Sequence, residues 1–224
     1  MKIILASTPT GVPVITAKIE EFVRKPASQI SVAIINEASA VEDGDSRWLI
    51  KGLNKVAKTF GGSIEIVNLS SLDIKTIEKK INKADVIWCF GGSTDWLKVV
   101  FCKTGFDKLL PELLKSKVWV GSSAGSCIMG KRNTFEIDSK IYSGEKYFDV
   151  SEYLSYINAF IYPHCWSPLV SKETPQVLLN SSKTNNFPVY LLSEKSALII
   201  EGNKNYLIGK KAWKIVNGKI VEKI

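Results

Sequence analysis

The sequence has one histidine, and only four cysteines (Cys89, Cys102, Cys127 and Cys165), among 224 residues. None of the cysteines forms a CxxC pair. Because protein zinc sites are built mainly from cysteine and histidine at short spacings, we expect no zinc site. The motifs described below imply no metal or organic cofactor either, so none is expected. Free thiols that are not paired in disulfides are typical of the cytoplasm, which is the compartment we expect.

Long apolar runs are also missing. No stretch approaches the roughly 18 apolar residues that a membrane span requires. The first apolar run, residues 3–6, is followed at once by the polar Ser7 and Thr8, and it is shorter than the roughly 7–15 residues of a signal-peptide core. We therefore expect a first buried strand there, no targeting segment and no membrane partner.

Arginine is scarce, since it occurs only at Arg24, Arg47 and Arg132, although the formal net charge is +8. The basic charge therefore comes almost entirely from lysine, a hydrated point charge. Base edges and carboxylates are more often gripped by the planar guanidinium group. Lysines scattered along the chain indicate a solvated surface, so we expect no nucleic-acid partner.

The hydrophobic and charged fractions, 45% and 23%, are those of a globular protein. Apolar, β-branched runs alternate with segments of helical periodicity. The runs predicted as strands are residues 3–6, 30–35, 64–69, 86–90 and 118–120. The predicted helical segments are 47–60, 73–83 and 94–115, the last interrupted near Gly105 and Pro111. This alternation predicts an α/β fold with a mostly parallel central sheet and helices on both faces.

The last third of the chain has a different pattern. Short apolar runs at 188–193, 197–201, 206–209 and 214–216 are separated by turn residues, among them Asn217-Gly218, which is typical of a hairpin. We expect these strands to form an antiparallel C-terminal edge. Because no linker or repeat interrupts the chain, residues 1–224 are predicted to be a single domain.

A G-x-S-x-G motif, residues 121–125, directly follows the fifth predicted strand. A sharp turn between a strand and a helix lifts such a serine out of the sheet, and the glycines let the backbone pack closely. Ser123 is therefore the candidate nucleophile, and the alternative is a purely structural turn. The helix start also aims free N–H groups at any oxyanion that forms.

A serine nucleophile needs a base, and the single histidine, His164, follows the apolar run 157–162. A carboxylate should orient its imidazole. Asp138 and Glu194 are the two candidates, and spacing along the chain does not decide between them. A second glycine pair ends the fourth strand, so the N–H groups of Gly92 and Ala124 are predicted to form the oxyanion hole. A phosphate loop is the alternative, but the pair lacks both G-x-G-x-x-G and Gly-Lys-Thr/Ser.

These motifs resemble the dipeptidase E family of serine peptidases, which includes α-aspartyl dipeptidases and the related cyanophycinases. The resemblance rests on residues 90–97, 103–109, 121–126, 162–164 and 191–197. It implies a class I glutamine amidotransferase-like fold, with Ser123 as nucleophile and His164 as general base. Both acids fall where family acids have been proposed, and Glu194 ranks ahead of Asp138 because it directly follows a strand.

Two positions depart from the family pattern. Ser93 stands where the family has asparagine, and it is a candidate for contact with substrate. Aspartyl dipeptidases also carry an arginine, in a Glu-Thr-Arg segment, that clamps the aspartate side chain. This chain has Glu173-Thr174-Pro175 instead, with Lys172 as a possible substitute that lacks the bidentate fork. Strict aspartyl specificity is therefore not expected.

The sequence thus predicts a serine-type peptidase that hydrolyses a dipeptide or short peptide through a Ser-His-acid triad. Two alternatives remain open. Amidotransferases of similar fold place a cysteine at the turn where this chain has Ser123. A non-catalytic regulatory or binding protein could keep the same scaffold. The oligomeric state is also open, with a homodimer as one option.

Overall fold

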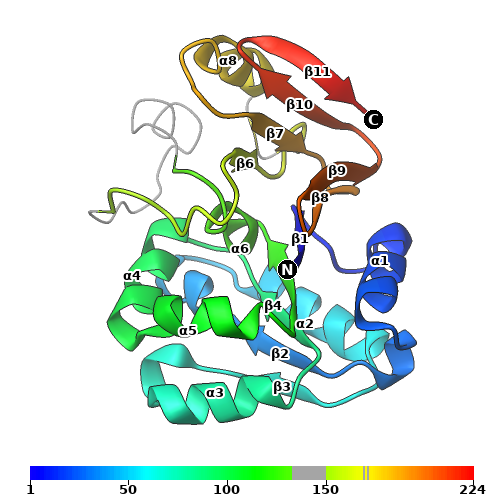
Figure 1. The fold of residues 1–224 in the computed structure, drawn as a ribbon, viewed down its shortest axis with the longest axis vertical. Helices are drawn as coiled ribbons and strands as arrows, with labels where there is room; N and C mark the ends of the chain where they lie inside the picture. Colours follow the sequence, from blue (N-terminus) through cyan, green and yellow to red (C-terminus); the bar gives the residue numbers. More distant parts are fainter. Residues whose placement is uncertain (133–149, 169, 171) are drawn as a thin grey trace.

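The computed structural model describes residues 1–132, 150–168, 170 and 172–224. A seven-stranded sheet forms its larger part (Figure 1). In spatial order the strands are β3 (Ile64–Ile66), β2 (Val32–Ile35), β4 (Val86–Cys89), β5 (Val118–Ser122), β1 (Lys2–Ala6), β8 (Ser196–Glu201) and β9 (Lys204–Gly209). The pairs from β3 to β1 are parallel, whereas β8 and β9 are antiparallel. The fold class predicted from the sequence is confirmed.

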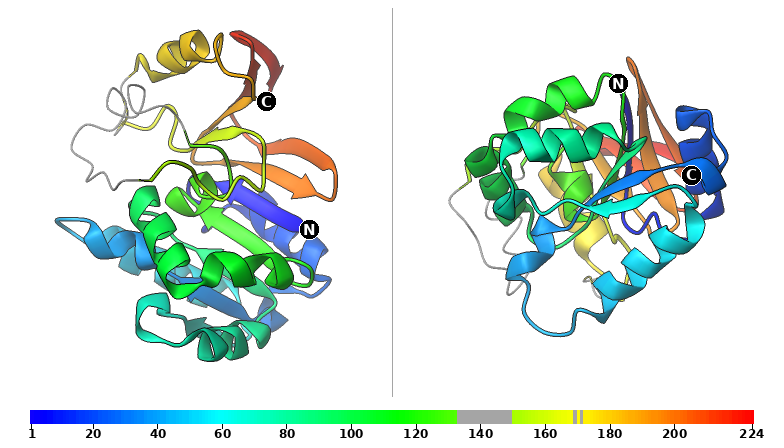
Figure 2. Two further views of the ribbon diagram at one scale, coloured as in Figure 1. Left: turned by 60° about the vertical axis from the view of Figure 1, so that its left-hand side comes forward. Right: turned by 90° about the horizontal axis from the view of Figure 1, so that it is seen from below.

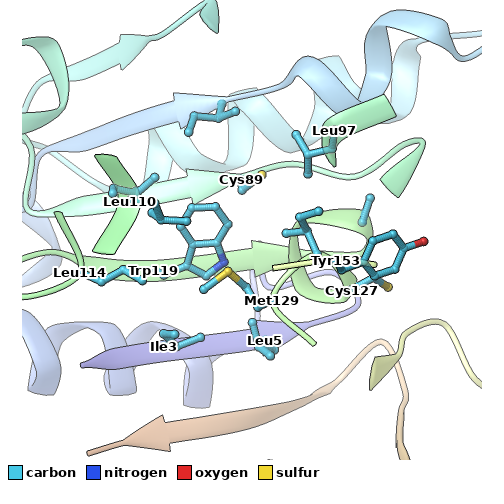
Figure 3. Close-up of a cluster of buried hydrophobic side chains, with 14 of the residues drawn as sticks. Ile3, Leu5, Cys89, Leu97, Leu110, Leu114, Trp119, Cys127, Met129 and Tyr153 are labelled. Carbon is cyan, nitrogen blue, oxygen red and sulfur yellow. The ribbon is translucent and has the colours of Figure 1, made fainter. Parts of the chain in front are cut away.

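Helices cover both faces of this sheet because successive side chains of each strand point to opposite faces. On one face Ile4 of β1 packs with residues of α1 (Pro13–Val23) and α2 (Arg47–Thr59). Figure 2 shows helices on both faces of the sheet. On the face opposite to α1 and α2, Ile3 packs with residues of three other helices. These are α3 (Ile74–Asn82), α4 (Thr94–Thr104) and α5 (Phe106–Leu113). Figure 3 shows the second cluster around the buried Trp119.

A second sheet of four strands lies beside the first, in the order β11-β10-β7-β6 (Figure 1). Its strands are β6 (Phe160–Tyr162), β7 (Val189–Leu192), β10 (Ala212–Val216) and β11 (Lys219–Lys223). β6 and β7 are parallel, and the other pairs are antiparallel. Helix α8 (Thr174–Ser181) packs on it through Leu178. The sequence predicted the late strands as one edge, but only β8 and β9 form the edge of the large sheet.

Several predicted boundaries shift. β3 ends at Ile66, and the predicted remainder of that strand contains the start of a short 3-10 helix, η3 (Leu69–Ser71). The helical region 94–115 is divided once, at Gly105, whose φ of 74° ends α4. The predicted interruption at Pro111 is wrong, because α5 continues through it to Leu113. A proline removes one backbone hydrogen bond, and here the helix ends two residues later. Helices α1 and α8 were not predicted.

Two further 3-10 helices are η1 (Ala27–Gln29) and η2 (Glu37–Val41). Helix α6 (Ala124–Cys127) follows β5 and contacts β1, β4 and β6. Among the described helices, none is long and apolar enough to cross a membrane.

Candidate active site

Ser123 occupies a sharp turn between β5 and α6. Its φ of 53° and ψ of −116° are unusual for a residue with a side chain, and such strain is often kept at functional sites. Its N–H donates to the carbonyl oxygen of Ala6 at 2.9 Å. The turn is therefore fixed directly to the end of β1.

The two glycines of the motif are required by close backbone packing. A Cβ on Gly121 would lie 2.3 Å from the carbonyl oxygen of Gly125, and one on Gly125 would lie 2.2 Å from that of Cys89. The fully buried Ser126 then joins the helix to the sheet, because its hydroxyl bonds both the N–H and the carbonyl of Ala6, each at 2.8 Å. Glycine at position 121 therefore lets the turn close on itself, and glycine at position 125 lets it pack against β4.

The second glycine pair lies against Ser123. A Cβ on Gly91 would lie 2.8 Å from the Cβ of Ser123 and 3.3 Å from its Oγ. Gly92 has a φ of 127°, and a Cβ there would lie 2.2 Å from the carbonyl oxygen of Ala38. The loop that ends β4 therefore brings its backbone next to the Ser123 side chain. Ala124 is the first residue of α6, so its N–H has no acceptor within the helix.

His164 and Glu194 form a close pair although they follow different strands. Their side chains meet at 2.6 Å between Nδ1 of His164 and Oε1 of Glu194. A carboxylate accepts hydrogen bonds, so the proton of this contact belongs to Nδ1, and Nε2 of the neutral imidazole is then an acceptor. The pair has the arrangement expected of a base and the acid that orients it.

The environment keeps the Glu194 carboxyl ionised. Burial alone would raise its pKa, but the hydrogen bond and charge of His164, together with a hydrogen bond from Thr8, outweigh burial and lower the pKa below its ordinary value. Thr8 Oγ1 donates to Oε2 of Glu194 at 2.6 Å. At neutral pH the carboxylate is therefore available as an acceptor on both oxygens.

The backbone of His164 is also held in an unusual conformation, with a φ of 58°. Its N–H donates to the Oγ of Ser7 at 2.8 Å, and the hydroxyl of Ser7 donates to the carbonyl oxygen of Leu192 at 3.2 Å. Ser7 is buried at the end of β1. It connects the segment after β6, which carries His164, to the last residue of β7.

The remaining residues predicted from the sequence are placed as follows. The hydroxyl of Ser93 is buried and accepts the N–H of Trp96 at 3.2 Å, which caps helix α4. Lys172 is exposed shortly before α8. Asp138 lies outside the described residues. Contact of Ser93 or Lys172 with substrate, and a role for Asp138, stay predictions.

Sequence reasoning missed Ser7 and Thr8, which contact His164 and Glu194. Their position in the sequence could have indicated a role at the site, because they directly follow the first strand. Ligands bind at the carboxyl ends of parallel strands. Within the described residues, no group of three or more His, Cys, Asp or Glu could hold a metal ion.

Comparison with protein families matches residues 4–208 to the model of peptidase family S51. Among curated proteins, the chain is 25% identical over 177 residues to the uncharacterized peptidase Lmo0363 of Listeria monocytogenes. That alignment covers 78% of this chain and 83% of the relative.

Two solved structures share the fold, each with a TM-score of 0.72. One is a protein of Listeria monocytogenes described as a peptidase E, which is 23% identical and is aligned over 93% of this chain and 98% of its own. The other is a peptidase from an acI-B1 actinobacterium, which is 14% identical and is aligned over 100% and 96%. At these sequence identities, the two comparisons show a shared fold and nothing more.

Proposed function

The chain belongs to peptidase family S51 and is therefore a peptidase, and we propose that it cleaves a dipeptide or short peptide through a triad of Ser123, His164 and Glu194. The observation that carries this proposal is the 2.6 Å contact between His164 and Glu194. It supports Glu194 as the acid because Nδ1 is occupied by the carboxylate, which leaves Nε2 to accept a proton from a serine.

In the proposed reaction, Ser123 Oγ attacks the scissile carbonyl while His164 Nε2 takes the hydroxyl proton. The negative charge that forms on the substrate oxygen is stabilised by the N–H groups of Gly92 and Ala124. His164 then gives its proton to the leaving amine, so that the peptide bond breaks and an acyl-enzyme forms. The same imidazole then deprotonates a water molecule, whose oxygen attacks the carbonyl of this ester. The imidazolium returns the proton to Ser123 Oγ as the bond between Oγ and the acyl carbon breaks, so that the acid product leaves and Ser123 is regenerated.

The positions of two backbone N–H groups, in two short turns, support them as the oxyanion hole. Gly91 lies against the Ser123 side chain, and Gly92 is the next residue of the same loop. The N–H of Ala124 directly follows the serine. Backbone donors of this kind need no reorganisation during the reaction, which is why they stabilise developing charge well.

We propose that the substrate is not restricted to an aspartyl residue. Pro175 is the second residue of α8 and ends the segment that resembles the Glu-Thr-Arg segment of the α-aspartyl dipeptidases, and unlike the arginine it offers no donor. The exposed Lys172 has a flexible ammonium group, which binds a carboxylate less specifically than a guanidinium. A screen of dipeptides with acidic, basic and apolar first residues should give activity on more than the acidic set.

We also propose that residues 1–224 act as a single domain. The contacts of Thr8 with Glu194 and of Ser7 with Leu192 join the two sheets at the site itself. A cytoplasmic location and a homodimer remain predictions from the sequence.

The test is the Ser123→Ala variant. It should lose turnover of every peptide that the wild type cleaves, on the order of 10⁶-fold, and lose labelling by a fluorophosphonate probe. Its stability should match the wild type, because the hydrogen bonds of Ser123 shown above are made by its backbone.

Ser122→Ala is the matched control. It removes the neighbouring hydroxyl, which donates to the carbonyl oxygen of Ser7 at 3.0 Å. This control should still bind the probe, and the label should be found on Ser123 by mass spectrometry. An active, labelled Ser123→Ala protein would contradict the proposed nucleophile.

A further inference from the structure

Three consecutive residues at the end of β1 each contact a different member of the proposed triad. The carbonyl oxygen of Ala6 accepts the N–H of Ser123 at 2.9 Å. The hydroxyl of Ser7 accepts the N–H of His164 at 2.8 Å, and the hydroxyl of Thr8 donates to Glu194 at 2.6 Å. The three triad residues come from separate segments, so the end of β1 is the element they share.

The topology explains why one strand reaches all three. In the large sheet β1 lies between β5 and β8, with Ala6 opposite Ser122 on one side and Ala197 on the other. The end of β1 is therefore beside the turn that carries Ser123. It is also beside the start of β8, which begins at Ser196, two residues after Glu194.

Thr8 contacts Glu194, the triad side chain that packing restrains least. The Glu194 side chain is 44% exposed, so neighbouring atoms do not fix the rotation of its carboxylate by contact alone. Its two oxygens are divided between two partners, with His164 on Oε1 and Thr8 on Oε2. With the Thr8 hydroxyl removed, Oε2 can turn toward solvent and draw Oε1 away from the imidazole.

We propose that Thr8 is a positioning residue of this peptidase, whose hydroxyl fixes the Glu194 carboxylate so that it holds the His164 imidazole in the reactive orientation. The inference rests on the proposed triad and adds a fourth side chain to it. Ser7 fixes the backbone of His164 from the same strand end, so both residues of the base and acid pair are oriented by β1.

The first test compares Thr8→Val, which keeps the shape but loses the hydroxyl, with Thr8→Ser, which keeps the hydroxyl. Thr8→Val should lower kcat about 10- to 100-fold, the effect of losing one hydrogen bond to a charged group, and leave KM within about 2-fold. Thr8→Ser should restore kcat to within about 3-fold of the wild type, because one hydroxyl does the positioning.

Thr104→Val is the matched control. It also removes a threonine hydroxyl, which bonds the carbonyl oxygen of Val100 at 2.8 Å near the end of α4. This control should keep the wild-type kcat. Thr8→Ala serves as a second hydroxyl-free variant if Thr8→Val does not fold.

The second test uses the fact that His164 is the only histidine in the chain. The low-field proton signal of its Nδ1–H can therefore be assigned in the NMR spectrum without mutagenesis. We expect the signal to broaden and shift upfield in Thr8→Val and to return in Thr8→Ser. A merely structural role for Thr8 would leave this signal unchanged in a folded variant.

The two proposals fail in distinguishable ways. If Ser123→Ala still hydrolyses peptides, the proposed nucleophile is wrong. If Ser123 is required but Thr8→Val keeps both the wild-type kcat and the His164 signal, only the role of Thr8 is overturned. The same conclusion follows if Thr8→Ser is as impaired as Thr8→Val.

Discussion

His164 and Glu194 meet at 2.6 Å although each comes from a loop beyond a different strand, β6 and β7 respectively. These two strands are parallel neighbours in the smaller sheet, so their carboxyl ends lie side by side. Ser123 follows β5 in the larger sheet. The proposed triad is therefore assembled across two sheets, and the end of β1 connects them.

The first prediction concerns the acid. Glu194→Gln keeps the shape of the side chain but offers only one acceptor oxygen for two donors, and it loses the charge that stabilises the imidazolium. We expect kcat to fall about 10²- to 10⁴-fold with a smaller change in KM. Steady-state kinetics on a cleaved dipeptide measure the effect.

Asp138→Asn is the comparison, and it should keep most of the wild-type activity because Glu194 already occupies Nδ1 of His164. A large loss in Asp138→Asn with an active Glu194→Gln would reverse the assignment and make Asp138 the acid.

The second prediction concerns stability at low pH. Because the folded protein lowers the pKa of Glu194, the ionised carboxylate stabilises the fold above the unfolded pKa, about 4.3. This stabilisation is lost as the pH falls through the lower, folded pKa. We expect the difference in unfolding free energy between the wild type and Glu194→Gln to shrink between about pH 6 and pH 3. Urea unfolding at several pH values measures it, and a difference that grows toward acid would contradict the shift.

The sequence predicted the parts of the site that depend on local pattern. The helical segment that starts at Asp73 is α3, where the Asp73 side chain accepts the N–H of Thr76 at 3.0 Å and caps the helix. The Ser123 turn was predicted in the same way, because an apolar strand, two glycines and a serine lie within a few residues. Each of these two patterns lies entirely within one short segment of the chain.

Contacts between distant segments could not be predicted. The runs that become β7 and β8 are alike in composition and only three residues apart, yet β7 joins the smaller sheet and β8 pairs with β1. Which strands β7 and β8 pair with depends on packing against other parts of the chain. For the same reason the contact of Thr8 with Glu194, which spans 186 residues, has no local pattern.

The third prediction compares the substitution of two neighbouring glycines, Gly91 and Gly92, by alanine. In Gly91→Ala the new methyl group would lie 2.8 Å from the Cβ of Ser123, so the serine must move. We expect kcat to fall on the order of 10²-fold, the usual effect of misplacing a reacting group by about 1 Å. The free energy of unfolding should fall less than in Gly92→Ala, because the backbone of Gly91 does not have a positive φ.

Gly92→Ala should lower the stability more than Gly91→Ala does, and it should also lower kcat because the N–H of Gly92 is a proposed oxyanion donor. Its methyl group would meet the carbonyl oxygen of Ala38, at a φ of 127° that disfavours any side chain. The unfolding free energy should fall by about 1–3 kcal/mol or more. Thermal unfolding and kinetics on both variants test the contrast, and an active Gly91→Ala would show that Ser123 does not need its present position.

The fourth prediction tests whether a cysteine could act in place of Ser123, as in amidotransferases. Burial raises the pKa of the Cys89 thiol, and the charge of Glu37 adds to the effect. Burial also raises the pKa of Cys165, to about 12, although the N–H of Trp166 and the charge of Lys211 oppose it. Neither thiol forms the reactive thiolate at neutral pH.

Cys127 is also buried, whereas Cys102 is exposed on α4. We therefore expect iodoacetamide at pH 7.5 to modify the native protein at Cys102 and to leave hydrolysis unchanged, with Cys102→Ser as the unlabelled control. The fluorophosphonate probe should stop hydrolysis in both proteins by reacting with Ser123. If alkylation of Cys127 instead abolished activity while the probe had no effect, the nucleophile would be that thiol, one helical turn beyond the serine.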